Sequence, residues 1–194
     1  MTDASLFHLF GKPPTCATGF PYTYSDGGRF AAGYKGSAQD CVARAIALAF
    51  QQTDEYKIIY HRLAQGQRAL GLPATARNGI RSLVSRNLLE AQGARFTDIK
   101  KWKRGLLPGD FPKGRFIAVF KGHFAACIDG VLFDTHDPTF KQRGNGPRRV
   151  NNLYGVWDCN DVDPITLRPG EIRVPDLQDL KAANRAPRGR TPDK

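Results

Sequence analysis

The chain has 194 residues, is 41% hydrophobic and carries a formal net charge of +11. This length fits one ordinary domain with tails, and the apolar share is sufficient for a buried core, which excludes a wholly disordered chain. No stretch approaches the roughly 18 apolar residues that a membrane-spanning helix needs. The segment Met1–His8 lacks the basic start and long apolar run of a secretory signal. We therefore expect a cytoplasmic protein with no membrane partner.

Four cysteines stand far apart in the chain, at Cys16, Cys41, Cys127 and Cys159. No two of them form the closely spaced pair that is typical of a structural zinc site. Because the chain shows no export signal, we expect free thiols in a reducing compartment rather than disulfides.

The first 36 residues are rich in glycine, proline and aromatic residues without a period, and we interpret them as an N-terminal arm in which Phe20–Tyr24 is extended. Ser37–Asp40 supplies small and capping residues, and a nearly wholly apolar helix is expected from Cys41 to about Gln52. Thr53 begins a second helix that ends near Gly71, with acidic residues in its first turn.

A third helix is predicted from Arg77 to Leu89 by an apolar stripe at helical spacing. From Ala94 onward the pattern changes to strands, which we place at 115–120, 124–128, 131–135 and 150–157. Helices followed by strands indicate an α+β fold. We expect the main domain to span 37–172, and we expect 173–194 to be a basic tail with little intrinsic structure.

A cysteine at the start of the first helix is the most informative feature of the sequence. Unpaired N–H groups and the helix dipole at that position favour a thiolate. Some eighty residues later, His123 opens a strand, and the returning strand carries Asp134. A thiol nucleophile needs a histidine as its base and an acid to orient that histidine, so the order Cys41, His123, Asp134 indicates a thiol hydrolase.

The turn between the two strands decides which acid faces His123. Asp129-Gly130 is a strong signal for a two-residue turn, and with that turn opposed positions sum to 259. Asp134 then lies diagonally from His123 on the same face. A three-residue turn would instead bring Asp137 opposite His123, because a shift of one residue exchanges the two faces. We favour Asp134 and keep Asp137 as the alternative.

The helix and hairpin together resemble the papain-like cysteine peptidase superfamily. Gln39–Ala45 looks like the Asp-Gly-Asn-Cys-Leu-x-Arg-Ala element of ovarian-tumour-type deubiquitinases, shortened before the cysteine. Gly122–Phe124, followed by Asp137-Pro138, is similar to the bacteriocin-leader peptidases. The whole pattern, from Gly36 to Trp157, most resembles small papain-like proteins encoded by phages and prophages.

The resemblance implies a papain-like fold, in which the helix that carries the cysteine packs on a C-terminal antiparallel sheet. It implies hydrolysis of a peptide or isopeptide bond, with Cys41 as nucleophile, His123 as base and no cofactor. A phage-encoded protein of this kind would work in the host cytoplasm or in a virion, which is a large assembly.

An oxyanion site needs hydrogen-bond donors near the nucleophile. The backbone N–H of Cys41 is one candidate and the side-chain amide of Gln39 is the other, with helix capping as the simpler role for Gln39. The papain pattern has its glutamine several residues earlier, where this chain has Lys35. We expect no metal site, because no acid or thiol completes a recognisable set of ligands with His123 and His136.

Two basic blocks flank the hairpin. Residues 95–121 hold eight basic and two acidic residues, and 141–149 hold four basic residues and no acid. An aromatic residue among cations suits contact with phosphates and bases, so the alternative hypothesis is an inactive scaffold that binds nucleic acid or an acidic protein. The residues expected to make these contacts are Lys100, Lys101, Trp102, Lys103, Arg104, Arg148 and Arg149. A third hypothesis keeps the triad but transfers the acyl group to an amine.

Overall fold

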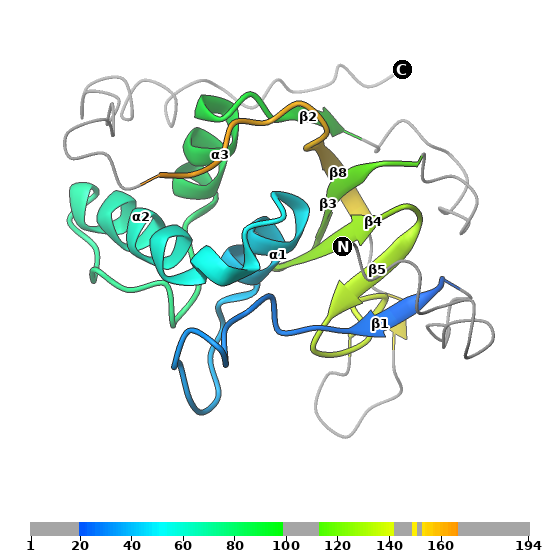
Figure 1. Cartoon of the computed structure of the whole chain (residues 1–194), viewed down its shortest axis with the longest axis horizontal. Helices are drawn as coiled ribbons and strands as arrows, with labels where there is room; N and C mark the ends of the chain where they lie inside the picture. Colours follow the sequence, from blue (N-terminus) through cyan, green and yellow to red (C-terminus); the bar gives the residue numbers. More distant parts are fainter. Residues whose placement is uncertain (1–19, 99–112, 142–148, 151–152, 167–194) are drawn as a thin grey trace, which may run out of the picture.

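A computed structural model describes residues 20–98, 113–141, 149–150 and 153–166. The described chain is α+β, as predicted, with helices gathered on one side of a twisted sheet (Figure 1). Its three α-helices are α1 (Cys41–Ala49), α2 (Tyr56–Ala69) and α3 (Ser82–Ala91), with a 3-10 turn, η2 (Thr53–Glu55), before α2.

Six strands form the main sheet, in the order β1-β5-β4-β3-β8-β2. They are β1 (Tyr22–Tyr24), β2 (Arg95–Asp98), β3 (Arg115–Phe120), β4 (His123–Ile128), β5 (Val131–Asp134) and β8 (Leu153–Asp158). A separate pair, β6 (Phe140–Lys141) and β7 (Arg149–Val150), follows β5.

The sheet is mixed, which corrects the expectation of a purely antiparallel sheet. β1 pairs with β5 in parallel, whereas β4–β5, β3–β4, β3–β8 and β2–β8 are antiparallel. The three helices intervene between β1 and the strands of the hairpin, and a connection of that length permits a parallel pair. Residues 20–24, which the sequence places in an extended part of the arm, thus supply one edge of the sheet.

Helix α1 lies at the centre of the molecule, between the sheet and α2 (Figure 1). Seven of its nine residues are buried, which confirms the prediction of a buried helix. It is shorter than predicted because it ends at Ala49, and Gln51 then adopts a positive φ of 57°. A left-handed residue reverses the chain direction and stops the helix.

Helix α3 begins at Ser82, five residues later than the sequence predicts. Gly79 has a φ of 90°, and Arg81 is extended at the N-cap position. A residue with positive φ cannot continue a right-handed helix, so the apolar stripe alone placed the start too early.

Strand β3 contributes to apolar clusters on both faces of the sheet. Ile117 packs with α1 and with Trp157 of β8, and its side chain is fully buried. Phe116, Ala118 and Phe120 pack in the other cluster. The alternation follows from the period of two along a strand, and it fixes which face of the neighbouring β4 looks toward α1.

The β4–β5 hairpin has the register that the sequence predicts. Ala126 opposes Phe133 and Ile128 opposes Val131, so opposed positions sum to 259. The two turn residues, Asp129 and Gly130, have φ values of 49° and 81°. Positive φ at both positions is the geometry of a type I′ turn, whose twist matches that of paired strands.

We expect Gly130→Ala to lower the free energy of unfolding by about 1 kcal/mol, because alanine disfavours a left-handed φ. A Cβ built on Gly130 meets nothing within 4 Å, so the cost is conformational rather than steric. Urea unfolding measures the change. Asp129→Asn is the matched control, since asparagine tolerates the same φ and keeps the oxygen that accepts from the Gly114 N–H at 2.9 Å. Equal stability of Gly130→Ala and wild type would contradict the turn assignment.

In the part of the chain that the structure describes, no helix has the length and apolarity to cross a membrane. The tail predicted at 173–194 and residues 1–19 of the arm lie outside the described residues. The described residues thus cover 20–36 of the predicted arm and, with gaps, 37–166 of the predicted main domain.

Candidate active site

Cys41 is the first residue of α1, so its backbone N–H and those of the next residues have no intrahelical acceptor. The thiol is half-buried and free. Its neighbours across the helix–sheet contact come from the start of β4. The thiol interacts with the His123 side chain and the backbone of Phe124, and both interactions lower its pKa. The nucleophile predicted from the sequence and its predicted base are thus in direct contact.

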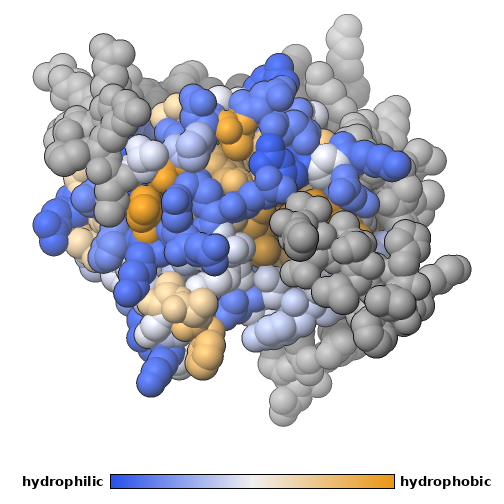
Figure 2. Space-filling model, viewed as in Figure 1, coloured by the Kyte–Doolittle hydropathy of each residue, from blue (hydrophilic) through white to orange (hydrophobic). Residues whose placement is uncertain are grey.

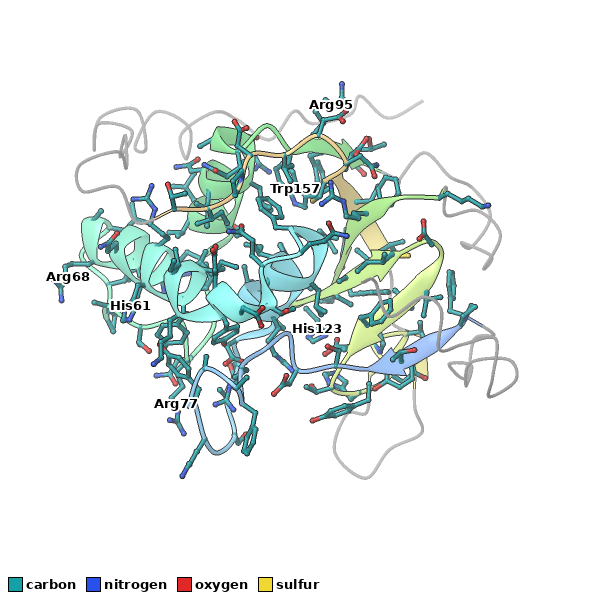
Figure 3. The ribbon with its side chains drawn as sticks, in the orientation of Figure 1. His61, Arg68, Arg77, Arg95, His123 and Trp157 are labelled. Carbon is teal, nitrogen blue, oxygen red and sulfur yellow. The ribbon has the colours of Figure 1, made fainter. Side chains whose placement is uncertain are left out.

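His123 also hydrogen-bonds Asp134, through its Nε2 and the Oδ2 of the carboxylate. Asp134 is buried at the end of β5, on the strand next to β4. Because Nε2 is engaged by the carboxylate, Nδ1 is the ring nitrogen that remains for Cys41. Figure 3 places His123 between α1 and β5, near the centre of the view.

Asp137, the alternative acid, lies in the turn that follows β5. Its Oδ1 accepts hydrogen bonds from the Thr139 N–H at 2.9 Å and from the Thr139 hydroxyl at 2.5 Å. The structure therefore brings Asp134 to His123 and uses Asp137 to hold a turn. In the β4–β5 register, opposed positions sum to 259, and this register places Asp134 diagonally from His123. The register therefore distinguishes Asp134 from Asp137.

The contacts of His123 favour a charged ring. Burial acts to lower its pKa, but hydrogen bonds and charge from Asp134 and Cys41 outweigh burial and raise the pKa to about 9. Burial likewise acts to raise the pKa of the Cys41 thiol. Here the hydrogen bond and charge of His123, the Phe124 backbone and the charge of Arg44 reverse the effect, so the pKa lies below its ordinary value. The two groups favour a thiolate–imidazolium pair.

The other two described thiols behave in the opposite way. Cys127 in β4 and Cys159 after β8 are free and buried, and burial raises the pKa of each to about 12. They are the core cysteines that their apolar surroundings predict. Cys16 lies outside the described residues.

Gln39, the predicted side-chain donor to an oxyanion, is exposed two residues before Cys41. Its backbone N–H donates to the carbonyl of Arg77 at 2.7 Å, which ties the approach to α1 to the loop before α3. A Cβ built on Gly79 would lie 4.0 Å from Gln39 Oε1. The residue therefore borders the site, while the Cys41–His123–Asp134 hydrogen bonds form without it.

Asp40 occupies the N-cap position of α1 but does not cap the helix. Its carboxylate makes no cap hydrogen bond. It accepts from Arg29 Nε at 2.7 Å and from the Tyr56 hydroxyl at 2.7 Å, and it is 1% exposed. This corrects the expectation that Ser37–Asp40 supplies a capping side chain. A buried carboxylate near two arginines is held by those charges in preference to backbone N–H groups.

His123, Asp134 and His136 each offer one donor atom, and these atoms lie within 4.8 Å of one another. This corrects the expectation that no acid completes a set of metal ligands. The two imidazole rings are 4.8 Å apart, and the His136 side chain is 58% exposed. The Arg44 guanidinium lies 3.7 Å from Asp134 Oδ1, and its positive charge opposes a cation there.

A groove of about 900 Å³ lies next to the segments that carry the triad, and Arg44 lines it while Cys41, His123 and Asp134 do not. Its lining includes Asp40 and Thr135, the chain neighbours of Cys41 and Asp134. The loop that joins β1 to α1 forms its outer wall and shows an apolar patch (Figure 2). Phe30 on that loop is 74% exposed, and Tyr24 at the end of β1 is 68% exposed. Two exposed aromatic side chains in one groove are suited to hold an apolar ligand group.

Most of the predicted basic surface lies outside the described residues. Residues 100–104 and 148 lie outside the described residues, and only the backbone of Arg149, in β7, is described. The described arginines that Figure 3 labels, Arg68, Arg77 and Arg95, lie at the periphery, away from His123.

Sequence reasoning missed the contacts of three polar residues around the triad: Asp40, Arg44 and Thr135. One signal was available for Arg44, because it is the single charge on an otherwise apolar buried helix. Thr135 meets Arg44 from a segment 91 residues away, and Asp40 is held by Arg29 and Tyr56, which lie 11 and 16 residues away; no local pattern reports these contacts.

Comparison of the chain with protein-family models, with curated proteins and with solved structures found no match. The chemistry of the site is therefore argued from its own geometry.

Proposed function

We propose that this protein is a thiol hydrolase of papain-like design that cleaves a peptide or isopeptide bond. One observation carries the proposal: His123 hydrogen-bonds Asp134 and interacts with Cys41, which begins a buried helix. A nucleophile, a base and an orienting carboxylate in series form the arrangement that acyl transfer requires. The α+β architecture and the resemblance of the Cys41 and His123 segments support a papain-like fold for it.

In the first half-reaction, the Cys41 thiolate attacks the substrate carbonyl carbon and forms a carbon–sulfur bond. Negative charge moves to the carbonyl oxygen, where the backbone N–H of Cys41 can donate and Gln39 remains the candidate side-chain donor. The imidazolium of His123 gives its proton to the leaving nitrogen. The carbon–nitrogen bond breaks, the amine departs, and a thioester on Cys41 remains.

In the second half-reaction, neutral His123 accepts a proton from water as the water oxygen attacks the thioester. The carbon–sulfur bond breaks, the carboxylic acid departs, and the thiolate–imidazolium pair is restored. Asp134 holds the ring in the orientation that both steps need and stabilises its positive charge.

The groove beside the triad is the proposed binding site for the acyl part of a peptide. Exposed Tyr24 and Phe30 on its walls favour an apolar side chain. We expect Phe30→Ala to raise KM several-fold with little change in kcat, because the residue contacts substrate away from the reacting atoms. Steady-state kinetics on the best substrate measures the two constants. A fall in kcat at unchanged KM would contradict this placement.

The test of function is a cleavage screen. A mixture of denatured proteins or synthetic peptides is incubated with wild type and with Cys41→Ala, and new termini are identified by mass spectrometry. Termini that appear with wild type alone support peptide hydrolysis. Repeating the reaction with an added primary amine separates hydrolysis from acyl transfer, since transfer leaves the amine attached to the product.

The pKa values predict a plateau in activity with pH. Cys41 is a thiolate above its lowered pKa, and His123 keeps its proton up to a pKa of about 9. We therefore expect kcat/KM to be high at neutral pH and to fall as pH rises through about 9, when His123 can no longer protonate the leaving amine. A pH–rate profile checks this expectation. Activity that keeps rising above pH 9, as for an ordinary thiol, would exclude the ion pair.

The charge of the chain favours a second candidate, an inactive scaffold that binds nucleic acid or an acidic protein. Residues 95–121 carry a net charge of +6 from eight basic and two acidic residues. Binding to single-stranded DNA that weakens steeply with salt, and that Lys101→Glu or Trp102→Ala reduces, would support this candidate. Wild-type affinity in both variants would exclude it.

A further inference from the structure

A chain of buried charges continues from the triad into α1 and the loop before it. Asp40, at the start of α1, lies between two arginines. Its Oδ2 is 2.7 Å from Arg29 Nε, and its Oδ1 is 3.1 Å from Arg44 Nε. The Asp40–Arg44 contact joins successive turns of the helix, four residues apart. The Tyr56 hydroxyl donates to the same carboxylate from α2.

Arg44 reaches from α1 to the end of β5. Its Nη1 donates to the Thr135 hydroxyl at 2.5 Å and lies 3.7 Å from Asp134 Oδ1. The Thr135 N–H donates to the same Oδ1 at 2.6 Å. Asp134 thus bonds His123 through Oδ2, while its Oδ1 lies near Arg44 and accepts from the Thr135 N–H. The side chains of Arg44 and Asp134 are 9% and 3% exposed.

The signs of charge alternate along this path. Arg29, Asp40, Arg44 and Asp134 alternate positive and negative, and the His123 imidazolium and Cys41 thiolate continue the series. Water screens buried charges weakly, so each member stabilises its neighbours more than a surface pair would. Without Arg44, the buried Asp134 carboxylate and Asp40 would each lose a counter-charge.

We propose that Arg44 is a positioning residue: it fixes the Asp134 carboxylate toward His123 and, through that contact, stabilises the Cys41 thiolate–His123 imidazolium pair. This inference rests on the proposed function. An arginine suits the role because its planar fork addresses two carboxylates at once, whereas the single ammonium of a lysine serves one. Arg44 lines the proposed substrate groove, but the role assigned to it here acts through Asp134 and through its charge.

The experiment measures how fast iodoacetamide alkylates Cys41 as a function of pH, by intact mass, in a Cys16→Ser background. We compare wild type with Arg44→Met, Arg44→Lys and Thr135→Val. Arg62→Met is the matched control, because Arg62 is also a buried arginine, 9% exposed, but lies on α2. Unfolding in urea is recorded for every variant, so that lost stability and lost activation are seen separately.

We expect Arg44→Met to move the midpoint of the alkylation profile upward by about one pH unit, and hence to slow the reaction at pH 6 about tenfold. Arg44→Lys should restore part of the shift, because it keeps the charge. Thr135→Val, which removes one partner of Arg44, should shift the midpoint in the same direction by less. Arg62→Met should lower stability and leave the midpoint unchanged. If the role of Arg44 were merely structural, Arg44→Met would behave in the same way.

A wild-type midpoint below that of a free thiol, together with unchanged midpoints in Arg44→Lys and Thr135→Val, would overturn the positioning role while the proposed function stands. If Arg44→Met does not fold, these two milder variants decide the question. A wild-type midpoint at the ordinary value for a thiol would overturn both the proposed function and this inference.

Discussion

Replacing His123 with alanine should slow alkylation of Cys41 at pH 6 by one to two orders of magnitude. A free thiol with a pKa of about 8.5 is less than about 1% thiolate at that pH. In the folded protein, the hydrogen bond and charge of His123 oppose the effect of burial and lower the pKa of Cys41. Removing the imidazole leaves burial, which raises the pKa, as the dominant influence.

Labelling is followed by intact mass in the Cys16→Ser background, where Cys127 and Cys159, with pKa values near 12, should not react. Cys41→Ala should abolish the label. His61→Ala is the matched control, because this exposed histidine on α2 contacts Tyr60 and lies away from the site. Equal rates for wild type and His123→Ala would show that His123 does not activate the thiol.

The second large effect concerns stability. We expect Asp40→Leu to lower the free energy of unfolding by about 3–5 kcal/mol, because it leaves the buried cation of Arg44 and the partly buried cation of Arg29 without their shared carboxylate. The Tyr56 hydroxyl, whose pKa burial and the Asp40 hydrogen bond raise, would also lose its acceptor. Urea unfolding measures the loss.

Asp54→Asn is the control for Asp40→Leu, since Asp54 is an exposed acid in the turn before α2 and its replacement should change stability little. Asp40→Asn keeps the shape and removes the charge, so it should fall between the two. A loss below about 1 kcal/mol in Asp40→Leu would mean that the arginines find other partners, and the charge network would then not be a structural requirement.

Local chemistry made much of the site predictable. An apolar stretch that opens with cysteine predicts a buried helix with the thiol at its N-terminus, and α1 has that form. Asp129-Gly130 predicts a type I′ turn, and the turn fixes the register. Parity along the strands then brings Asp134, and not Asp137, to His123. Each step depends on residues close together in the sequence or on the strict period of a strand.

Long-range contacts set the rest. The parallel pairing of β1 with β5 joins segments separated by the three helices, so no local pattern indicates it. Asp40 resembles a helix cap in sequence, yet Arg29 and Tyr56 hold it in the fold. His136, by contrast, lies beside His123 with the two rings tilted by 55°, as the register with a sum of 259 predicts.

The same long-range contacts explain the role that we assign to Arg44. A single arginine on an apolar helix is unusual in the sequence, but its partners Thr135 and Asp134 lie about ninety residues away. The sequence therefore signals that the residue needs partners and does not identify them.

Acylation of Cys41 tests the central claim most directly, because it needs no knowledge of the natural substrate. Wild type is mixed with p-nitrophenyl acetate near neutral pH, and intact mass follows the acetyl adduct while absorbance follows the released nitrophenol. The account predicts a rapid burst of one equivalent, an adduct on Cys41 that water then removes, and loss of both in Cys41→Ala. His123→Ala should slow acylation and hydrolysis of the adduct. Acetylation of Cys41 no faster than that of a free thiol, with no turnover, would contradict a thiol hydrolase.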